Sequence, residues 1–201
     1  KYILVATGGW PAKPEFPGVE HCITSNEVFH LPEQPKCLVV QGGGYIAMEF
    51  AAIFNALGSD VNVINRSDKL LRSYDVQIVE RMLHIAMERG IDFHLNSSIE
   101  KVEKTDDGCF LVSTGSENPI RADQVLIATG RVPNTRGLGL ENAGIELDEK
   151  GAIPVDEYNQ TSCDSIYAVG DVTNRVQLTP VAIREGAAFV DTVFHGRLTK
   201  A

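Results

Sequence analysis

A glycine-rich turn between two apolar runs is the stretch of this sequence best suited to hold phosphate. Residues 37–40 form an apolar run with the length of a buried strand, and the glycines that follow have the spacing Gly42-x-Gly44-x-x-Ala47. In such a motif Gly42 permits a tight turn, Gly44 lets the backbone approach a pyrophosphate, and Ala47 keeps the following helix close to the strand. Free N–H groups at the helix start then face the phosphates. The pattern predicts a dinucleotide-binding turn.

Two arginines stand where a nucleotide site selects its ligand. A second strand is predicted at residues 61–64, and in NAD sites an acidic residue about 20 positions after the first glycine binds the ribose hydroxyls. Here the corresponding positions hold Asn65 and Arg66, and Arg72 follows in the next loop. A guanidinium matches a phosphate dianion with a bidentate fork. We therefore expect NADP(H), with Arg66 and Arg72 on its 2′-phosphate; the alternative is two solvated surface arginines.

The elements that must position these groups follow from hydrophobic periodicity. The first predicted helix ends at Gly58, and a second runs from Asp75, its N-cap, to Gly90. Strands are expected at residues 91–95 and 124–130, with a β-meander between them. This order predicts an α/β fold with a Rossmann-like dinucleotide-binding βαβ domain. The two helical stripes that we expect to be buried are Ile46, Phe50, Ile53, Phe54 and Leu57, and Val76, Val79, Met82, Leu83, Ala86 and Met87.

The end of the predicted meander domain echoes the start of the chain. Residues 3–11 and 126–133 both read as a strand, then Ala-Thr-Gly, two further residues and Pro. Two dinucleotide-binding units with the same terminal strand would produce this echo, and a chance match is the alternative. A later strand at residues 165–169 ends in Gly170-Asp171, where an acid is well placed for ligand hydroxyls. A last helix is predicted from Thr179, as its N-cap, to about His195.

Composition excludes several classes of function. The 201 residues are 43% hydrophobic and 22% charged, which is ordinary for a soluble globular protein. A net charge of −9 without any basic run argues against nucleic acid, and no apolar run reaches the roughly 18 residues of a membrane span. The four scattered cysteines lack redox or metal-ligand spacing. We expect structural thiols, no metal site and a cytoplasmic location.

Taken together, the motifs resemble the flavoprotein disulfide reductases, and within that family the glutathione reductase branch. The matching segments are residues 42–49, Arg66 with 71–75, 128–134, 167–172 and 178–183, which together span nearly the whole chain. The resemblance implies that residues 1–16 close a first FAD-domain segment. It also implies that 17–132 form the NADPH-binding domain and that 133–201 are the second FAD-domain segment.

The resemblance implies roles for single residues as well. Tyr45 would cover the flavin until nicotinamide displaces it, and Glu49 would pair with a lysine of the FAD domain near flavin N5. For Glu49 the alternative is a first-turn acid favoured by the helix dipole. Asp171 would hold the ribityl chain, and the Thr179 N–H would meet the flavin pyrimidine oxygen. Further cofactor contacts are expected from Gly42, Gly44, Ile46, Ala47, Ala128, Gly130 and Leu178.

The implied reaction passes hydride from NADPH to FAD, and electrons then reach a redox disulfide and oxidised glutathione. The family's FAD-phosphate glycine motif, its cysteine pair separated by four residues and its dimer-forming interface domain with a catalytic His are not found among these residues. We therefore expect a piece of a longer homodimeric enzyme, inactive alone and weak in FAD binding. Residues 186–194, with Ala187, resemble trypanothione reductases instead, whereas 57–61 and 131–134 favour glutathione reductases. A non-catalytic NADP-binding sensor is a further alternative.

Overall fold

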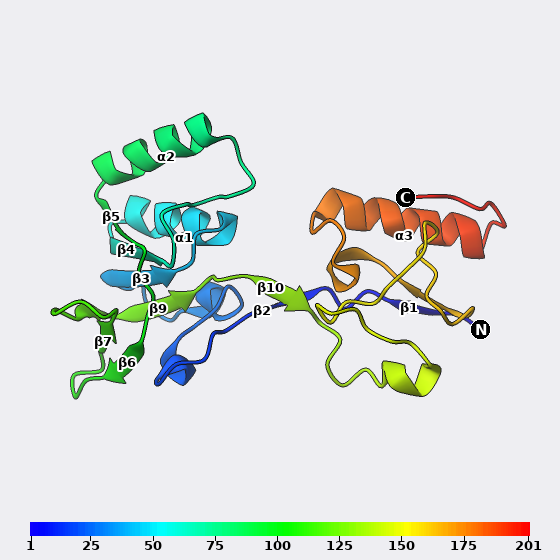
Figure 1. Cartoon of the computed structure of the whole chain (residues 1–201), viewed down its shortest axis with the longest axis horizontal. Helices are drawn as coiled ribbons and strands as arrows, with labels where there is room; N and C mark the ends of the chain where they lie inside the picture. Colours follow the sequence, from blue (N-terminus) through cyan, green and yellow to red (C-terminus); the bar gives the residue numbers. More distant parts are fainter. The chain divides into compact units, whose positions relative to one another are not determined.

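The computed structural model describes all residues from Lys1 to Ala201, and the chain divides into two compact units (Figure 1). The first unit comprises Lys1–Trp10 and Arg131–Ala201, and the second comprises Pro11–Gly130. The second unit is therefore an insertion in the sequence of the first. No helix in either unit combines the length and the apolar character that crossing a membrane requires.

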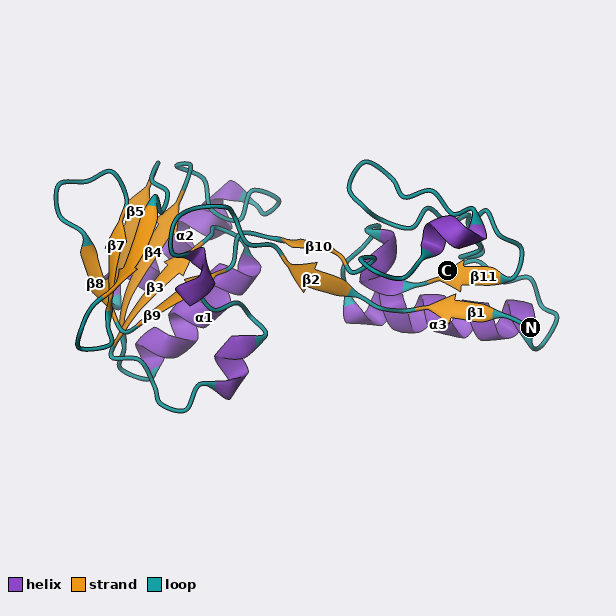
Figure 2. Ribbon diagram, turned by 90° about the horizontal axis from the view of Figure 1, so that it is seen from below, coloured by secondary structure: helices purple, strands orange, loops and turns teal.

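A parallel sheet of four strands forms the centre of the second unit (Figure 2). Its strand order is β5-β4-β3-β9, and all three pairings are parallel. Because β3 lies between β4 and β9, the strand order reverses beside β3, and open sheets of this kind bind ligands there, at the carboxyl ends of the strands. The strands are β3 (Cys37–Gln41), β4 (Asp60–Asn65), β5 (Ile91–Leu95) and β9 (Gln124–Ile127).

The two faces of this sheet are covered differently (Figure 1). Helices α1 (Tyr45–Ala56) and α2 (Val76–Glu88) pack on the face that carries Leu38 and Val40. An antiparallel meander, β6 (Lys101–Lys104), β7 (Phe110–Ser113) and β8 (Ile120–Ala122), covers the face that carries Val39. Successive strand residues point to opposite faces, and both faces are covered, so residues 37–40 of β3 are apolar without alternation. The βαβ order and the meander are as the sequence predicted.

The predicted buried stripes of both helices are wrong in part. Helix α1 buries Ala47, Met48, Ala51 and Phe54, whereas Ile53 and Leu57 are exposed. The inner face of α1 carries two alanines, which let the helix approach the sheet closely. A prediction that follows only the large apolar residues therefore places the buried face wrongly. In α2 the central residues pack on the core, but Val76 and Met87 at its ends are exposed.

The first unit is built on β1 (Ile3–Val5) and β11 (Ile166–Ala168), which pair in parallel. Its core gathers residues from both sequence segments, including Val5, Ile153 and Val172. Helix α3 (Thr179–Val193) begins one residue earlier than predicted: Leu178 is the N-cap, Thr179 is the first helical residue, and no side chain caps the helix. Pro180 is therefore the second helical residue, where its missing N–H removes no intrahelical hydrogen bond. The remaining elements are β2 (Gly9–Pro11), which pairs with β10 (Arg131–Pro133), and the short 3₁₀ helices η1 (Val19–His21), η2 (Glu27–His30), η3 (Leu140–Ala143) and η4 (Gly170–Thr173).

The two Ala-Thr-Gly segments have equivalent surroundings. In the first unit the Thr7 hydroxyl donates to the Asn134 carbonyl oxygen (2.7 Å), and the Asn134 N–H donates to Gly8 O (2.9 Å). In the second unit the Thr129 hydroxyl donates to Ala12 O (3.1 Å), and the Ala12 N–H donates to Gly130 O (3.0 Å). Asn134 and Ala12 each follow the proline of the other segment. This correspondence favours two related units over a chance match.

Candidate functional site

The glycine turn between β3 and α1 depends on Gly42. This residue has φ +143°, and a Cβ built on it would overlap the carbonyl oxygen of Ala128, which follows β9. Its N–H donates to Ile64 O in β4 (2.9 Å), so the turn sits close above the strand ends. Gly44 is different, because a Cβ on it would meet nothing within 4 Å. The first glycine is required for packing, and the third leaves open space at the start of the helix.

The start of α1 is free to receive an anion. Gly44 is its N-cap, no side chain accepts from the first N–H groups, and no acid lies in the first turn. Helical N–H groups at this end have no intrahelical acceptor, and the helix dipole makes the end positive. Ala47 is fully buried against the turn, and Ile46 is half-buried. The open cradle and the uncapped helix therefore fit a pyrophosphate.

A tightly folded loop after β4 carries both predicted arginines. Asn65 is buried, and its side-chain amide donates to Ser67 O (2.9 Å) and Lys69 O (3.1 Å), which folds the loop tightly. The Leu71 N–H donates to Gly43 O (2.7 Å), so the loop is tied to the glycine turn. Gly43 itself leaves room for this arrangement, because a Cβ there would lie 2.7 Å from Asn65 Oδ1.

The arginine side chains on this loop have no carboxylate partner. Arg72 Nη2 donates to the Ser67 hydroxyl (2.9 Å), next to Arg66, and neither arginine forms an ion pair. Both are exposed. Sequence reasoning missed Ser67, whose hydroxyl places the second guanidinium; a hydroxyl residue directly after Arg66 was the available signal. Two unneutralised guanidiniums on one loop can bind a phosphate dianion.

A cavity of about 430 Å³ opens at the carboxyl ends of the strands in this unit. Gln41 and Asn65 line it as the last residues of β3 and β4. Gly42, Arg66 and Thr129 line it from the segments that follow β3, β4 and β9. Ala128 is half-buried, and its N–H donates to Gln41 O (2.8 Å). A volume of this size lies within the range of small-molecule sites. Gly44 and Tyr45 do not line the cavity, so the helix start opens beside it.

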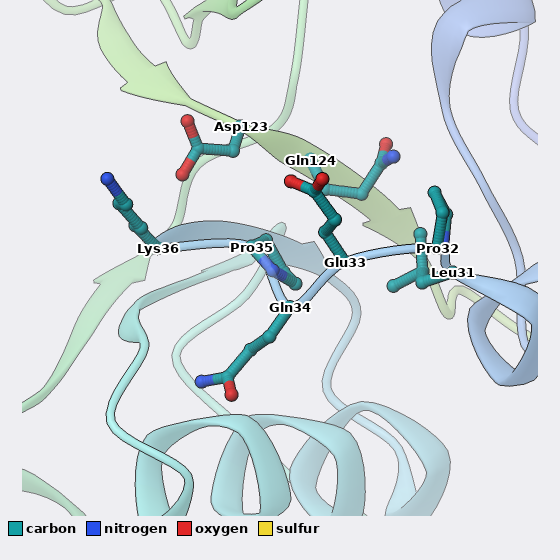
Figure 3. Close-up of a pocket in the computed structure, with 8 residues that line it drawn as sticks. All are labelled: Leu31, Pro32, Glu33, Gln34, Pro35, Lys36, Asp123 and Gln124. Atoms are coloured by element: carbon teal, nitrogen blue, oxygen red, sulfur yellow. The ribbon is translucent and has the colours of Figure 1, made fainter.

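A second cavity, of about 320 Å³, lies at the opposite, amino ends of β3 and β9 (Figure 3). Figure 3 shows Glu33, Lys36 and Asp123 around it, from the segment before β3 and the residue before β9. The Asp123 carboxylate accepts from the Cys37 N–H (2.8 Å), which lowers the pKa of this acid. Ligands of such sheets bind at the carboxyl ends, so we do not assign the nucleotide to this cavity.

Tyr45 and Glu49 lie on the first turns of α1 without partners. Tyr45 is the first helical residue and is 46% exposed. Glu49 is the fifth, so it stands outside the first turn, and the alternative of a dipole-stabilised first-turn acid is wrong. Glu49 is exposed and forms neither a hydrogen bond nor an ion pair within the chain. The predicted roles of both side chains remain predictions.

The strand end of the first unit is held by a buried network. The Gly170 N–H donates to Glu185 Oε2 (2.6 Å), and Arg175 Nη2 donates to Glu185 Oε1 (2.7 Å). Glu185 is only 4% exposed, and the same Arg175 nitrogen also donates to Asn159 Oδ1. Asp171, next to Gly170, is half-buried and its carboxylate forms no hydrogen bond. Sequence reasoning missed the whole network.

The start of α3 lies beside this strand end. A Cβ on Gly170 would be 3.3 Å from the Ala182 Cβ in the first turn of α3. Leu178 and Thr179 are exposed, and the first N–H groups have no side-chain cap. An uncapped helix start beside a free carboxylate can meet a polar ligand with both positive dipole and hydrogen-bond acceptors. Together with Asp171, these residues fit the edge of a flavin and its hydroxyl-bearing chain.

Three of the four cysteines have raised thiol pKa values. All four are free, and burial raises the pKa of Cys22 to about 11. Burial also raises the pKa values of Cys37 and Cys109. Since the thiolate is the nucleophile, these environments do not support thiol chemistry here. No group of three or more His, Cys, Asp or Glu side chains is arranged to hold a metal ion.

Comparisons with known proteins point in one direction. Residues 1–186 match the protein family described as pyridine nucleotide-disulphide oxidoreductase. A glutathione reductase from Nostoc sp. is 47% identical over 203 residues, covering 96% of this chain and 44% of that protein. A trypanothione reductase from Trypanosoma congolense is 43% identical, covering 100% of the chain and 41% of that protein.

A solved structure gives the same picture for the fold. The HOCl-induced flavoprotein disulfide reductase RclA from Escherichia coli matches with a TM-score of 0.91 and 32% identity, covering 100% of this chain and 46% of that one. The chain thus spans less than half the length of the curated relatives and of the structure that it matches. The Rossmann-like α/β fold predicted from the sequence is confirmed by this likeness.

Proposed function

The chain belongs to the pyridine nucleotide-disulphide oxidoreductase family, and from this premise we propose that it is the NADPH- and FAD-binding portion of a glutathione-disulfide reductase. Glutathione reductases of the family use FAD and NADPH, which would supply the hydride chemistry. The residues of this chain would bind and orient the two cofactors. Oxidised glutathione would be the substrate of the whole protein, which would act as a homodimer.

The observation that carries the proposal is the arginine loop beside the glycine turn. The 2′-phosphate distinguishes NADPH from NADH, and a site selects it by providing cations and omitting the carboxylate that would bind a free ribose hydroxyl. Arg66 and Arg72 provide the cations on one loop, and neither arginine has a carboxylate partner. Each charge-assisted contact contributes roughly 1.5–3 kcal/mol, so two favour NADPH by about a few hundredfold or more.

The remaining predicted residues take their places around these two cofactors. Tyr45 would cover the flavin when the nucleotide is absent, and Glu49, unpartnered in this chain, would hold a lysine ammonium of the FAD domain. Asp171 would accept hydrogen bonds from hydroxyls of the ribityl chain. The N–H groups at the start of α3 would stabilise negative charge at the pyrimidine edge. Residues 17–132 would form the NADPH domain, with 1–16 and 133–201 as segments of the FAD domain.

Trypanothione disulfide is the second candidate substrate. Residue 187 of α3 is an exposed alanine in this chain, and segment 186–194 is the part that favours this alternative. The full-length protein decides between them: NADPH oxidation should be at least about tenfold faster with glutathione disulfide than with trypanothione disulfide. The reverse ratio would identify trypanothione disulfide as the substrate. A holoenzyme that reduces neither disulfide would support the NADP-binding sensor.

Cofactor choice is tested directly by the paired change Arg66→Ala with Arg72→Ala. Titration calorimetry should show NADPH binding weakened by about a few hundredfold, because two charge-assisted contacts are lost, and NADH binding nearly unchanged. The matched control is Arg81→Ala with Arg89→Ala, which removes the same charge from exposed positions of α2 and its C-cap. If the first pair of substitutions leaves the preference for NADPH intact, the cofactor assignment fails.

A further inference from the structure

The last residue of β3 places a polar side chain where the strand pattern calls for an apolar one. Leu38, Val39 and Val40 are completely buried, and Gln41 continues them at 8% exposure. Gln41 Oε1 is the one buried side-chain oxygen or nitrogen in the chain without a hydrogen-bond partner. A desolvated acceptor that is left unpaired costs free energy, and such a group in a folded protein calls for an explanation.

The side chain of Gln41 lies at the nucleotide-binding end of the sheet. Its backbone is already used, because its carbonyl accepts from the Ala128 N–H (2.8 Å). Since Val39 packs toward the meander, Gln41, two residues later, faces the same side. There it lines the cavity of about 430 Å³, which Arg66 also lines. The unpaired carboxamide therefore borders the cavity that contains one of the two arginines assigned to the 2′-phosphate.

Three of the donor side chains around this cavity already have partners within the chain. The Thr129 hydroxyl donates to Ala12 O (3.1 Å), and the Lys13 ammonium donates to Cys22 O (2.6 Å). The Asn65 amide donates to Ser67 and Lys69, as described above. None of these donors is directed to Gln41.

We propose that Gln41 is a nucleotide-binding residue whose carboxamide hydrogen-bonds the adenosine half of NADP(H). This inference rests on the proposed function of the site. Phosphates offer only acceptors, so an unpaired Oε1 requires a hydroxyl or amino donor. In sheets of this topology the end of the second strand, here β4, contacts the adenosine ribose. Asn65, the last residue of β4, and Arg66, which follows it, both line the cavity. The adenosine ribose and the adenine amino group are donors of the required kind.

The test separates ligand binding from stability. Gln41→Leu removes the carboxamide and keeps the volume, and Gln41→Met is a second variant that preserves the unbranched shape if leucine does not fit. Urea unfolding should show each variant at least as stable as the parent chain, because an unpaired buried acceptor is gone. Calorimetry should show 2′,5′-ADP and NADP⁺ bound about tenfold more weakly, as expected for one hydrogen bond. Gln124→Leu, at the opposite end of the sheet, is the matched control and should change neither affinity.

Each other outcome overturns the inference. Unchanged affinities in stabilised variants would mean that Gln41 serves no ligand. Weaker NADP⁺ binding with unchanged 2′,5′-ADP binding would move the contact to the nicotinamide half. If 2′,5′-ADP binds the parent chain and is lost in the Arg66→Ala, Arg72→Ala variant but not in Gln41→Leu, this inference alone fails. If the parent chain does not bind 2′,5′-ADP, the proposed function fails with it.

Discussion

Both units have the polar groups of their proposed sites at the carboxyl end of a parallel strand, but these groups differ in how they are paired. In the first unit the strand end at Gly170 is held by Glu185, which is in turn held by Arg175. In the second unit Arg66 and Arg72 have no carboxylate partner, and the Gln41 acceptor has none at all. A buried network in which every group is hydrogen-bonded makes the backbone rigid, whereas unpaired groups can still form hydrogen bonds or ion pairs with a ligand. In the first unit the network therefore fixes the backbone beside Asp171, whereas in the second unit the charged groups remain unpaired.

The largest expected loss of stability comes from a substitution in the glycine turn at the strand end of the second unit. Gly42→Ala forces a side chain into left-handed backbone space and onto the Ala128 carbonyl. We expect a loss of about 3–5 kcal/mol in the free energy of unfolding, from backbone strain and overpacking combined. Urea denaturation measures it.

Gly44→Ala is the matched control for that substitution. Its Cβ meets no atom within 4 Å, so the stability should change by about 1 kcal/mol or less. NADPH binding should nevertheless weaken, because the methyl group occupies the approach to the helix start. Equal stability of the Gly42→Ala and Gly44→Ala variants would show that the glycine turn is not packed as described.

The next effect tests the network of the first unit. Glu185→Ala should cost about 2–3 kcal/mol of unfolding free energy, since a buried N–H and a guanidinium lose a charged acceptor. The unfolding free energy of Glu185→Gln should lie between those of Glu185→Ala and the parent, because a carboxamide oxygen can still accept from the Gly170 N–H. Glu49→Ala, which removes an exposed and unpaired acid in α1, should change stability by less than about 0.5 kcal/mol. A Glu185→Ala chain that unfolds at the parent's urea midpoint would contradict the contrast between the units.

Alkaline pH should act on the core of the second unit through Cys22. Burial raises the pKa of this thiol from 9.0 to about 11, so between these pH values the folded chain keeps a proton that the unfolded chain loses. The contribution is therefore fully present below about pH 9 and decreases as the pH rises. Linkage gives a loss of about 1 kcal/mol at pH 10. Unfolding midpoints at pH 8, 9 and 10 measure it, and Cys22→Val should remove this component; an unchanged slope in that variant would exclude Cys22 as its source.

The smallest effect concerns the stability role of Tyr45. Because this side chain is 46% exposed at the start of α1, Tyr45→Ala should change the free energy of unfolding by about 0.5 kcal/mol or less. In the full-length flavoprotein the same variant should increase the access of solvent quenchers to flavin fluorescence. A loss of about 3–5 kcal/mol, as for a truncated core aromatic, would instead identify Tyr45 as packing.

The contrast between the units also marks how far the sequence reaches. The glycine turn, the helix after it and the location of Arg66 and Arg72 on one loop were predictable, because each is decided within a few residues by turn geometry and periodicity. The inner face of α1 was not predictable, because alanine side chains are small: they permit close packing against the sheet but give a weak hydrophobic pattern. The Glu185–Arg175–Asn159 network joins side chains up to 26 residues apart, and no local pattern encodes such a meeting. Gln41 was not singled out from the sequence, because the missing partner of its side chain is visible only in the structure.

One measurement tests the central claim most directly: where NADP⁺ binds. Backbone amide shifts of the isotope-labelled 201-residue chain, recorded by NMR during a titration with NADP⁺, report on both units at once. We predict saturable shifts at residues 41–47 and 66–72 of the second unit, much weaker shifts with NAD⁺ at equal concentration, and none at residues 170–179 of the first. Shifts concentrated at residues 170–179, or equal responses to NADP⁺ and NAD⁺, would contradict the account.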